Sequence, residues 1–476
     1  MIKLRSPLIF LLPLSAIFTS KSLAKQTLFD DPYADTRTRP QNDMTRPNLK
    51  VLISGAGIAG NALAFWLTRL GHDVTVVERH PVLRVSGLQL DLRSHGIEVL
   101  RRMGLEQAFR AKSAPERGMQ VVDSTGKQRA YFPVSESGGK DQQGFTSEFE
   151  IMRGDLCRLF HDAAASSAGR NGAKYMFGTS IESFEQDDNS VDVRFDNGKT
   201  DRFDLLVGAD GQWSRTRKMM LGLGNESSGA TPADGLHPVE GLYFAYFTLN
   251  RPIEEGEQYL ATSYIAPGKR GIMTRRHSPH EMQVMLACKT DSHRLKNARR
   301  GDVEEEKTAF ADIFRGAGWQ AENLVESMRD ADDFYCERLG LVKLESWFRG
   351  RVALVGDAAY CPTVLTGMGT TSAVVGAYIL AGEIERQCGE IGSRDSIPSA
   401  LKAYERTFRP FMNEMQKGVL ENSPRQWDMM GSAFSVAVIN WVFSLASYFK
   451  VKAGLFGVRE TVKGWELPHY ENMALD

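Results

Sequence analysis

Three glycine-containing motifs, each at the end of an apolar stretch, constrain the fold of this chain most strongly. They occupy residues 51–60 (VLISGAGIAG), 205–211 (LLVGADG) and 352–359 (VALVGDAA). In each motif a buried strand is predicted to run into a tight turn that admits only small residues. Ligands of α/β sheets bind at the carboxyl ends of the strands. The motifs therefore predict an α/β fold in which distant segments of one domain share one ligand.

The first motif opens a βαβ unit over residues 49–77, the length typical of a dinucleotide-binding unit. Gly55 permits the tight turn, Gly57 lets the backbone approach a pyrophosphate, and Gly60 allows close packing of helix and strand. Glu78 lies at the end of the second strand, where a carboxylate accepts hydrogen bonds from ribose hydroxyls. A glycine-rich turn without any ligand is the alternative. Three motifs in this order favour one extended FAD molecule.

The composition excludes several other classes of protein. The chain has 476 residues, a net charge of −1 and 25% charged residues, which is ordinary globular composition and predicts no nucleic-acid partner. The five cysteines are scattered without a CxxC pair, and the histidines show no metal-ligand spacing. We therefore expect neither a metal site nor a disulfide framework.

The amino terminus has the three parts of a secretory signal. Lys3 and Arg5 precede an apolar run over residues 7–19, and small residues follow near Ala24. Residues 1–24 are predicted to be a cleaved signal, with an uncleaved anchor or a disordered leader as alternatives, and 25–48 a solvated linker. This predicts the secretory pathway or a membrane as the location, with the cytoplasm as the alternative.

A second uncharged stretch covers residues 431–449. Its length would suffice to cross a bilayer, but Asn440 and several serines dilute its hydrophobicity. We expect a packed or membrane-surface helix near the substrate entrance rather than a span, so that membrane association would come from this stretch or from the amino terminus.

The remaining strand and helix patterns predict two interleaved domains. The FAD-binding domain is Rossmann-like, and the substrate domain is a mixed or antiparallel β-sheet. The predicted FAD-binding segments are 49–118, 151–225 (with a β-hairpin) and 336–390, the substrate segments are 119–150 and 226–335, and C-terminal helices occupy 391–476.

With these motifs in order, the chain resembles the class A, para-hydroxybenzoate hydroxylase-like, flavoprotein monooxygenases over residues 50–409. Within that family it is most similar to the tetracycline-inactivating enzymes and to fungal secondary-metabolite hydroxylases and epoxidases. The resemblance implies that NAD(P)H reduces FAD, that O₂ adds to form a C4a-hydroperoxyflavin, and that one oxygen passes to a bulky hydrophobic small molecule. The flavin carries this chemistry, so no catalytic side chain is expected. The chain departs from the family at both ends.

The resemblance also assigns cofactor-binding roles along the first half of the chain. Glu78 and Arg79 match the family's Glu-Arg pair, and Arg84 lies where related enzymes place an arginine near the nicotinamide donor. Asp91 would lie beside the flavin. Arg153 corresponds to the arginine that opens a helix and contacts FAD, and a surface helix cap is its alternative role.

Further cofactor contacts are implied by the second and third motifs. Asp210 and Gly211 match an Asp-Gly motif that contacts FAD and the nicotinamide pyrophosphate, and a strand-ending turn, where such pairs are common, is the alternative. Asp357 matches the aspartate that binds the ribityl chain. Backbone N–H groups at the start of the following helix would stabilise the reduced flavin. The implied set is completed by Ala358, Gly367, Gly369 and Thr370.

Substrate contacts are predicted from the aromatic residues of the second domain. Tyr243, Tyr246 and Tyr264 could offer hydroxyl groups, while strand alternation predicts that one set of side chains faces the flavin and the other packs into the core. A flavin reductase or halogenase on the same scaffold and a non-catalytic flavin-fold binding protein are the alternative functions. The Trp-x-Trp-x-x-Ile pattern of halogenases is missing from the sequence.

Overall fold

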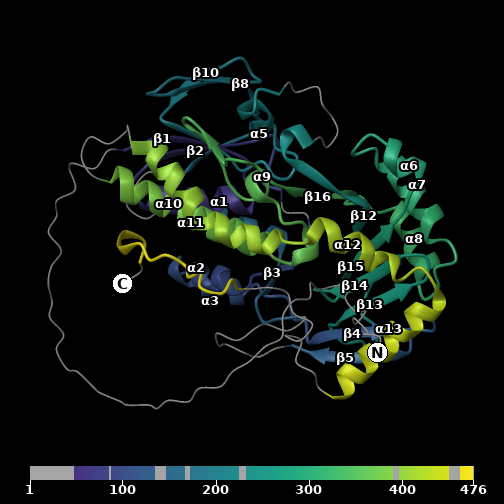
Figure 1. The fold of residues 1–476 in the computed structure, drawn as a ribbon. Helices are drawn as coiled ribbons and strands as arrows, with labels where there is room; N and C mark the ends of the chain where they lie inside the picture. Colours follow the sequence, from purple (N-terminus) through teal and green to yellow (C-terminus); the bar gives the residue numbers. More distant parts are fainter. Residues whose placement is uncertain are drawn as a thin grey trace, which may run out of the picture.

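The computed structural model describes residues 48–84, 87–134, 146–166, 172–223, 232–389, 396–449 and 461–474. Two large sheets and their helices form a mixed α/β structure with helices toward the carboxyl end, which confirms the predicted fold class (Figure 1). The predicted signal segment 1–24, and the linker up to residue 47, lie outside the described residues.

The first sheet brings the strands of the three glycine motifs side by side. Strand β1 pairs in parallel with β2 on one side and with β11 on the other, and β11 pairs in parallel with β18. Because these strands are parallel, their carboxyl ends, and the turns that follow them, meet at one edge. The order of strands is β17 (Phe348–Arg349), β18 (Val352–Leu354), β11 (Leu205–Gly208), β1 (Lys50–Ser54), β2 (Asp73–Glu78) and β7 (Lys174–Phe177).

Helices cover this sheet and bury its apolar strands. Helix α1 (Ile58–Arg69) packs against α4 (Arg153–Ala165) and against α10 (Gly369–Cys388), which in turn packs against α11 (Ile397–Gln416). Helix α10 is buried on nearly all sides, as its long apolar sequence requires. The shorter helices of this part are α2 (His95–Arg102), α3 (Glu106–Arg110), α5 (Arg215–Met220) and α9 (Asp357–Tyr360).

The second sheet is mainly antiparallel and has two different faces. Helices α6 (His293–Asn297), α7 (Val303–Phe314) and α8 (Ala321–Arg329) lie beside it, and α7 and α8 bury one face. Helices α12 (Val419–Asp428) and α13 (Ala433–Tyr448) pack on the other. The order is β16 (Tyr335–Val342), β12 (Leu236–Asn250), β15 (Glu281–Lys289), β14 (Arg270–Arg276), β13 (Ala261–Ala266), β4 (Gly118–Val122) and β5 (Gln128–Pro133).

One domain boundary differs from the sequence-based expectation. Residues 336–342 were assigned to the third FAD-binding segment, but β16 pairs with β12 in the second sheet. Two small sheets complete the fold. They consist of β10 (Thr200–Phe203), β9 (Val191–Phe195) and β8 (Ile181–Gln186), and of β3 (Gln89–Asp91) with β6 (Glu150–Met152).

The uncharged stretch 431–449 forms α13, which lies along the edge strand β5 (Figure 1). The Ser447 hydroxyl donates to the Tyr131 carbonyl (2.9 Å), and the Ser444 hydroxyl donates to the Arg129 carbonyl (2.7 Å). The serines thus satisfy backbone groups that an edge strand leaves unpaired. Among the described residues no single helix is long and apolar enough for a membrane span. One pair of segments, Ile397–Asp428 and Ala433–Tyr448, is long and apolar enough when taken together, but the two are bent by 110° relative to each other.

Candidate functional site

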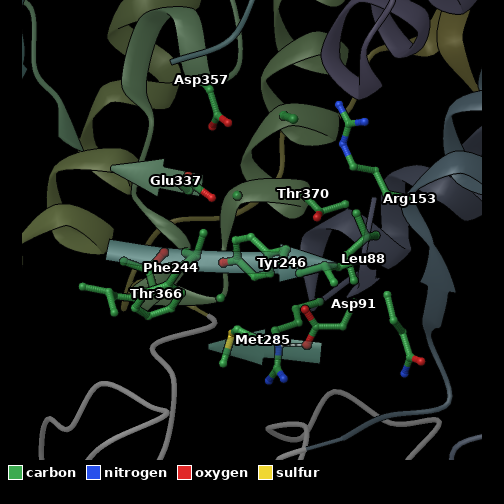
Figure 2. A pocket seen from close by; sticks show the side chains of 18 of the residues that line it. Leu88, Asp91, Arg153, Phe244, Tyr246, Met285, Glu337, Asp357, Thr366 and Thr370 are labelled. Carbon is green, nitrogen blue, oxygen red and sulfur yellow. Dashed lines mark hydrogen bonds and ion pairs between the residues drawn. The ribbon is translucent and has the colours of Figure 1, made fainter. Parts of the chain in front are cut away.

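A cavity of about 890 Å³ joins the carboxyl edge of the parallel sheet to one face of the antiparallel sheet. Its lining includes Gly57 from the first motif, Gly211 from the second, Asp357 from the third, and Phe244 and Tyr246 from β12. Figure 2 shows Asp357 and Glu337 at one side of this cavity and Arg153 across from them. The three glycine motifs therefore converge on one space, as the sequence predicted.

The glycines of the first motif have different physical roles. Gly55 has a φ of +110°, and a Cβ built on it would lie 2.6 Å from the Ala209 carbonyl oxygen, so it allows motifs one and two to touch. A Cβ on Gly60 would lie 1.9 Å from the Gly55 carbonyl oxygen. A Cβ on Gly57 would meet no atom within 4 Å, and Gly57 lines the cavity. Gly55 and Gly60 serve packing, whereas Gly57 presents bare backbone to the cavity.

Glu78 is held at the same turn by backbone hydrogen bonds. Its Oε2 accepts from the Ala56 N–H (3.0 Å) and its Oε1 from the His80 N–H (2.9 Å). The exposed Arg79 follows it. Arg84 lies over the Tyr335 ring at 5.9 Å, and withdrawal from solvent, followed by the nearby positive charge of Arg153, lowers the pKa of its guanidinium. Arg84 and Arg153 thus form a positive region, and of these two residues Arg153 lines the cavity.

Arg153 and Asp91 both line the cavity. Arg153 is the first residue of α4, and its N–H donates to the Leu88 carbonyl (3.0 Å), which ties the start of the helix to the segment before β3. Asp91 forms an ion pair with Arg93. Both residues therefore lie close to any ligand that fills the cavity, and their contacts with FAD stay a prediction.

Asp210 and Gly211 have different roles in the structure. The Asp210 carboxylate accepts hydrogen bonds from the N–H groups of Arg215 (2.9 Å) and Thr216 (3.0 Å) and from the Ser214 hydroxyl, so it caps the start of α5. Gly211, with a φ of +80°, lines the cavity, whereas Asp210 does not. The aspartate therefore positions the turn, and the glycine presents it to the cavity.

The third motif and the turn before α10 form the opposite wall. Asp357 begins α9 and lines the cavity, and burial raises the pKa of its carboxyl. Ala358 is fully buried, and its carbonyl accepts from Arg217 (3.1 Å), so its side chain faces the core. The cavity is also lined by Gly367, Gly369 and Thr370 at the start of α10.

Glu337 is a cavity residue that the sequence-based reasoning missed. It lies on β16 opposite Phe244 of β12 and lines the cavity beside Asp357 (Figure 2). Burial raises the pKa of Glu337 to about 7, the Asp357 carboxylate adds to this rise, and Arg153 opposes it. An acidic residue within a mostly apolar strand was the available signal, and the face on which it lies depends on the strand register.

The three predicted substrate tyrosines lie on different faces of the second sheet. Tyr246 lines the cavity and stacks on Tyr335 with ring centroids 4.9 Å apart. Tyr243 packs in the core that α7 and α8 cover. Tyr264 belongs to the same core, and its hydroxyl donates to the Ala317 carbonyl (2.7 Å). Tyr243 and Tyr264 therefore lie away from the cavity lining, whereas Phe244 and Tyr335 belong to it.

Comparison with known proteins identifies the family. The model of an FAD binding domain matches residues 48–418. The FAD-dependent monooxygenase asL4 of Sarocladium schorii is 48% identical over 438 residues, which cover 90% of this chain and 99% of that protein. This chain belongs to the class A FAD-dependent monooxygenases.

Two further relatives of this monooxygenase agree. The flavin-dependent monooxygenase eupH of a Phoma species is 43% identical, with 77% of this chain and 84% of the relative covered. The crystal structure of the tetracycline destructase Tet(51) is similar at a TM-score of 0.66 and 28% identity and covers 90% of this chain and 100% of that one. The expected likeness to tetracycline-inactivating enzymes is therefore confirmed.

The cavity of the monooxygenase fits a flavin dinucleotide. Gly57 leaves room for a close approach to the backbone at the start of α1, where the helix dipole favours phosphate groups. Asp357 is an acceptor in the cavity lining, and Glu78 is an acceptor bonded to Ala56, next to Gly57, outside that lining, so two polyhydroxyl segments of one ligand could bind at separate places. The start of α10 supplies N–H groups beside Gly369, where a Cβ would meet no atom within 4 Å. These residues can bind and orient the cofactor.

Proposed function

We propose that this enzyme uses NAD(P)H and O₂ to hydroxylate or epoxidise a bulky hydrophobic small molecule, as part of secondary metabolism. One observation carries the proposal. The same cavity extends from the glycine turn, where Gly57 lies, to the apolar face of the second sheet, where Phe244 and Tyr246 lie. Cofactor and substrate can thus share one space, and the bound substrate would displace water from the site of oxygen transfer.

The lining of the cavity supports an aromatic or polycyclic substrate. Tyr246 and Tyr335 stack, and the ring of Trp427 on α12 lies 5.9 Å from that of Phe244. Aromatic faces of this kind bind flat apolar molecules well. The tetracycline destructase among the similar structures is named for a polycyclic molecule, which agrees with this chemistry.

The residues of this chain would bind and orient the cofactor and the substrate, and they would exclude water from the site. When bound, FAD would supply the redox chemistry with O₂. Gly57, Gly211 and the start of α10 would bind its pyrophosphate and ring system through backbone groups, and Asp357 would accept from its ribityl hydroxyls. Phe244, Tyr246 and Trp427 would hold the substrate over it. The peroxide route and the nicotinamide donor remain predictions.

The test is oxygen incorporation by purified protein. FAD-loaded enzyme is supplied with NADH or NADPH, labelled O₂ and a panel of polycyclic phenols, and products are followed by mass spectrometry. We expect donor consumption stimulated by a substrate and one labelled oxygen atom in the product. Donor consumption with a reduced, unlabelled product would indicate a reductase. Bound FAD without any donor consumption would indicate a binding protein.

Asp357→Ala sharpens this test. Loss of the carboxylate at the carboxyl edge of the sheet should weaken FAD retention by about tenfold or more, since a hydrogen bond to a charged group contributes about 1.5 to 3 kcal/mol. Asp123→Ala is the matched control, because Asp123 lies in a surface turn that bonds Thr125 and Arg129. Its FAD retention should equal that of the wild type.

A further inference from the structure

A buried cluster of polar side chains lies behind the wall of the large cavity. Gln89 Nε2 donates to Glu116 (3.0 Å) and to Glu150 (2.6 Å). Arg275 Nη2 donates to the same two carboxylates, at 3.0 Å and 2.7 Å. The side chains of Glu116 and Glu150 are only 1% and 2% exposed. Two carboxylates are therefore held against one guanidinium and one amide, out of solvent.

The cluster reaches the cavity through Asp91. In the pairing of β3 with β6, Asp91 lies directly opposite Glu150. Side chains at directly opposite positions of an antiparallel pair lie on the same face and close together. Asp91 lines the cavity, and Figure 2 shows it at the wall below Arg153. A row of carboxyl groups thus leads from Glu116 through Glu150 to Asp91.

The charges around Glu150 do not balance when every carboxyl group is ionised. Asp91, Glu116 and Glu150 supply three negative charges, and the guanidinium groups of Arg93 and Arg275 supply two positive ones. An unbalanced charge is costly away from water, and one added proton removes it. Burial raises the pKa of Glu150, Arg275 opposes this rise, and Glu116 and Asp91 add to it.

Two further observations suit an exchange of protons between the cluster and the two cavities. Gln89 is 5% exposed and lines the cavity, and its Oε1 accepts no hydrogen bond from the described residues. A buried acceptor of this kind fits a donor such as a water molecule or a protonated carboxyl group. Arg275 lines both the large cavity and a second, polar cavity of about 510 Å³ on the other side, whose wall includes Thr262 and Thr274. Arg275, whose side chain is 20% exposed, therefore connects the buried carboxylates to this second cavity.

We propose that Glu116 and Glu150 share one proton and deliver it through Asp91 to the large cavity during oxygenation. The proposal rests on the proposed function, in which substrate, O₂, NAD(P)H and one proton give oxygenated substrate, NAD(P)⁺ and water. The O–H bond of Glu150 breaks as an O–H bond forms on Asp91, and that proton then passes to an acceptor oxygen in the cavity. Water in the second cavity returns a proton to the pair, and the carboxyl groups neither gain nor lose electrons.

The shared proton is tested first, without turnover. Infrared spectra of the FAD-bound protein are recorded between about pH 5 and about pH 9, where a raised carboxyl pKa would titrate. Because Glu337 and Asp357 also have raised pKa values, each variant spectrum is subtracted from that of the wild type, which removes the bands they have in common. We expect the difference spectrum of Glu150→Gln to contain a protonated-carboxyl C=O band at neutral pH that is missing at alkaline pH. The same band should appear for Glu116→Gln, because removal of the neighbouring charge lets Glu150 ionise. Difference spectra without this band for both variants overturn the proposal.

Glu148→Gln is the matched control for these spectra. Glu148 lies two residues from Glu150, but its carboxylate is on the surface and pairs with Arg110 (2.7 Å). Its band should match that of the wild type. Because no substrate or nicotinamide is present, this experiment gives an answer even if the proposed monooxygenase activity fails.

Delivery of the proton is tested on turnover. With FAD and substrate saturating, Glu150→Gln should slow oxygenation on the order of a hundredfold and abolish the alkaline limb of the pH profile. FAD affinity should remain that of the wild type, and Glu150→Asp, which keeps an acid, should restore most of the rate. If the Gln variant fails to fold, the Asp variant should show a shifted alkaline limb. An unchanged pH profile in a folded variant, or equal losses of FAD affinity and rate, would show that the cluster serves structure alone.

Discussion

The two large sheets of this enzyme form their parts of the site by different means. The parallel sheet contributes mainly backbone: its strands β18, β11 and β1 end at turns where Gly57 and Gly211 line the cavity. The antiparallel sheet contributes side chains, and all of its strands except the edge strand β5 have residues that line the cavity and residues in the core under α7 and α8. The geometry of a tight turn requires glycine, which can be recognised in the sequence. The face of the sheet on which a strand's side chain lies depends instead on the register of strand pairing.

Gly60→Ala should have the largest effect on the parallel sheet. A Cβ there would lie 1.9 Å from the Gly55 carbonyl oxygen, which is backbone and cannot move aside cheaply. We expect a loss of about 4 kcal/mol or more in the free energy of unfolding of the FAD-free protein, measured by urea denaturation. A change below about 1 kcal/mol would show that the turn is not packed as described.

Gly57→Ala is the matched variant, because its Cβ would meet no protein atom within 4 Å. The FAD-free protein should keep its stability to within about 1 kcal/mol. FAD should bind about tenfold more weakly or worse, because the methyl group occupies the space needed by the pyrophosphate. Equal FAD affinity in wild type and Gly57→Ala would separate this turn from the cofactor site.

In the antiparallel sheet, two substitutions on strand β12 should affect substrate binding and protein stability differently. Tyr243→Ala removes a ring from the core under α7 and α8 and should cost about 3 kcal/mol of stability, with KM for substrate unchanged. Tyr246→Ala removes a ring from the cavity wall and should raise KM by about tenfold, with a smaller loss of stability. Thermal unfolding and steady-state kinetics of both variants check this. Equal effects on KM would mean that the two faces of β12 do not differ in function.

Glu337→Gln should change how the stability of the FAD-free protein depends on pH. The pKa of Glu337 is raised from its ordinary value to about 7, so the folded state binds more protons than the unfolded state between these values. Stability from this group is therefore fully present at acid pH and falls, by on the order of 1 to 3 kcal/mol, as the pH rises to about 7. The Glu337→Gln variant should lose this decrease of stability with rising pH. The Glu182→Gln variant, at a surface pair with Arg194, should keep it. An unchanged slope in Glu337→Gln would place its carboxyl in ordinary solvent.

The difference between the sheets also explains what could be predicted from the sequence. Gly57 and Asp357 were found because each follows a strand at a recognisable turn, and the segment before α10 was found because it leads from the third motif into a helix. Tyr246 was found together with Tyr243, since alternation predicts two faces without saying which is which. Glu337 and Gln89 were missed because their positions depend on the pairings β12–β16 and β3–β6, which join segments far apart in the chain. Asp210 was assigned to the cofactor on its motif, but its carboxylate bonds the start of α5.

Asp210→Asn should give the smallest effect. It tests whether the Asp210 carboxylate positions the backbone of the turn or contacts the cofactor directly. The carboxylate accepts from two N–H groups at the start of α5, so its loss should cost about 1 kcal/mol of stability. Ser214→Ala is the matched variant, since Ser214 caps the same helix by accepting from the Arg217 N–H (2.9 Å). Because Asp210 acts by positioning Gly211, both variants should weaken FAD binding equally and by less than about fivefold, as measured by flavin fluorescence. A much larger loss in Asp210→Asn alone would show that the carboxylate contacts the cofactor directly. This part of the parallel sheet would then bind through a side chain, as the antiparallel sheet does.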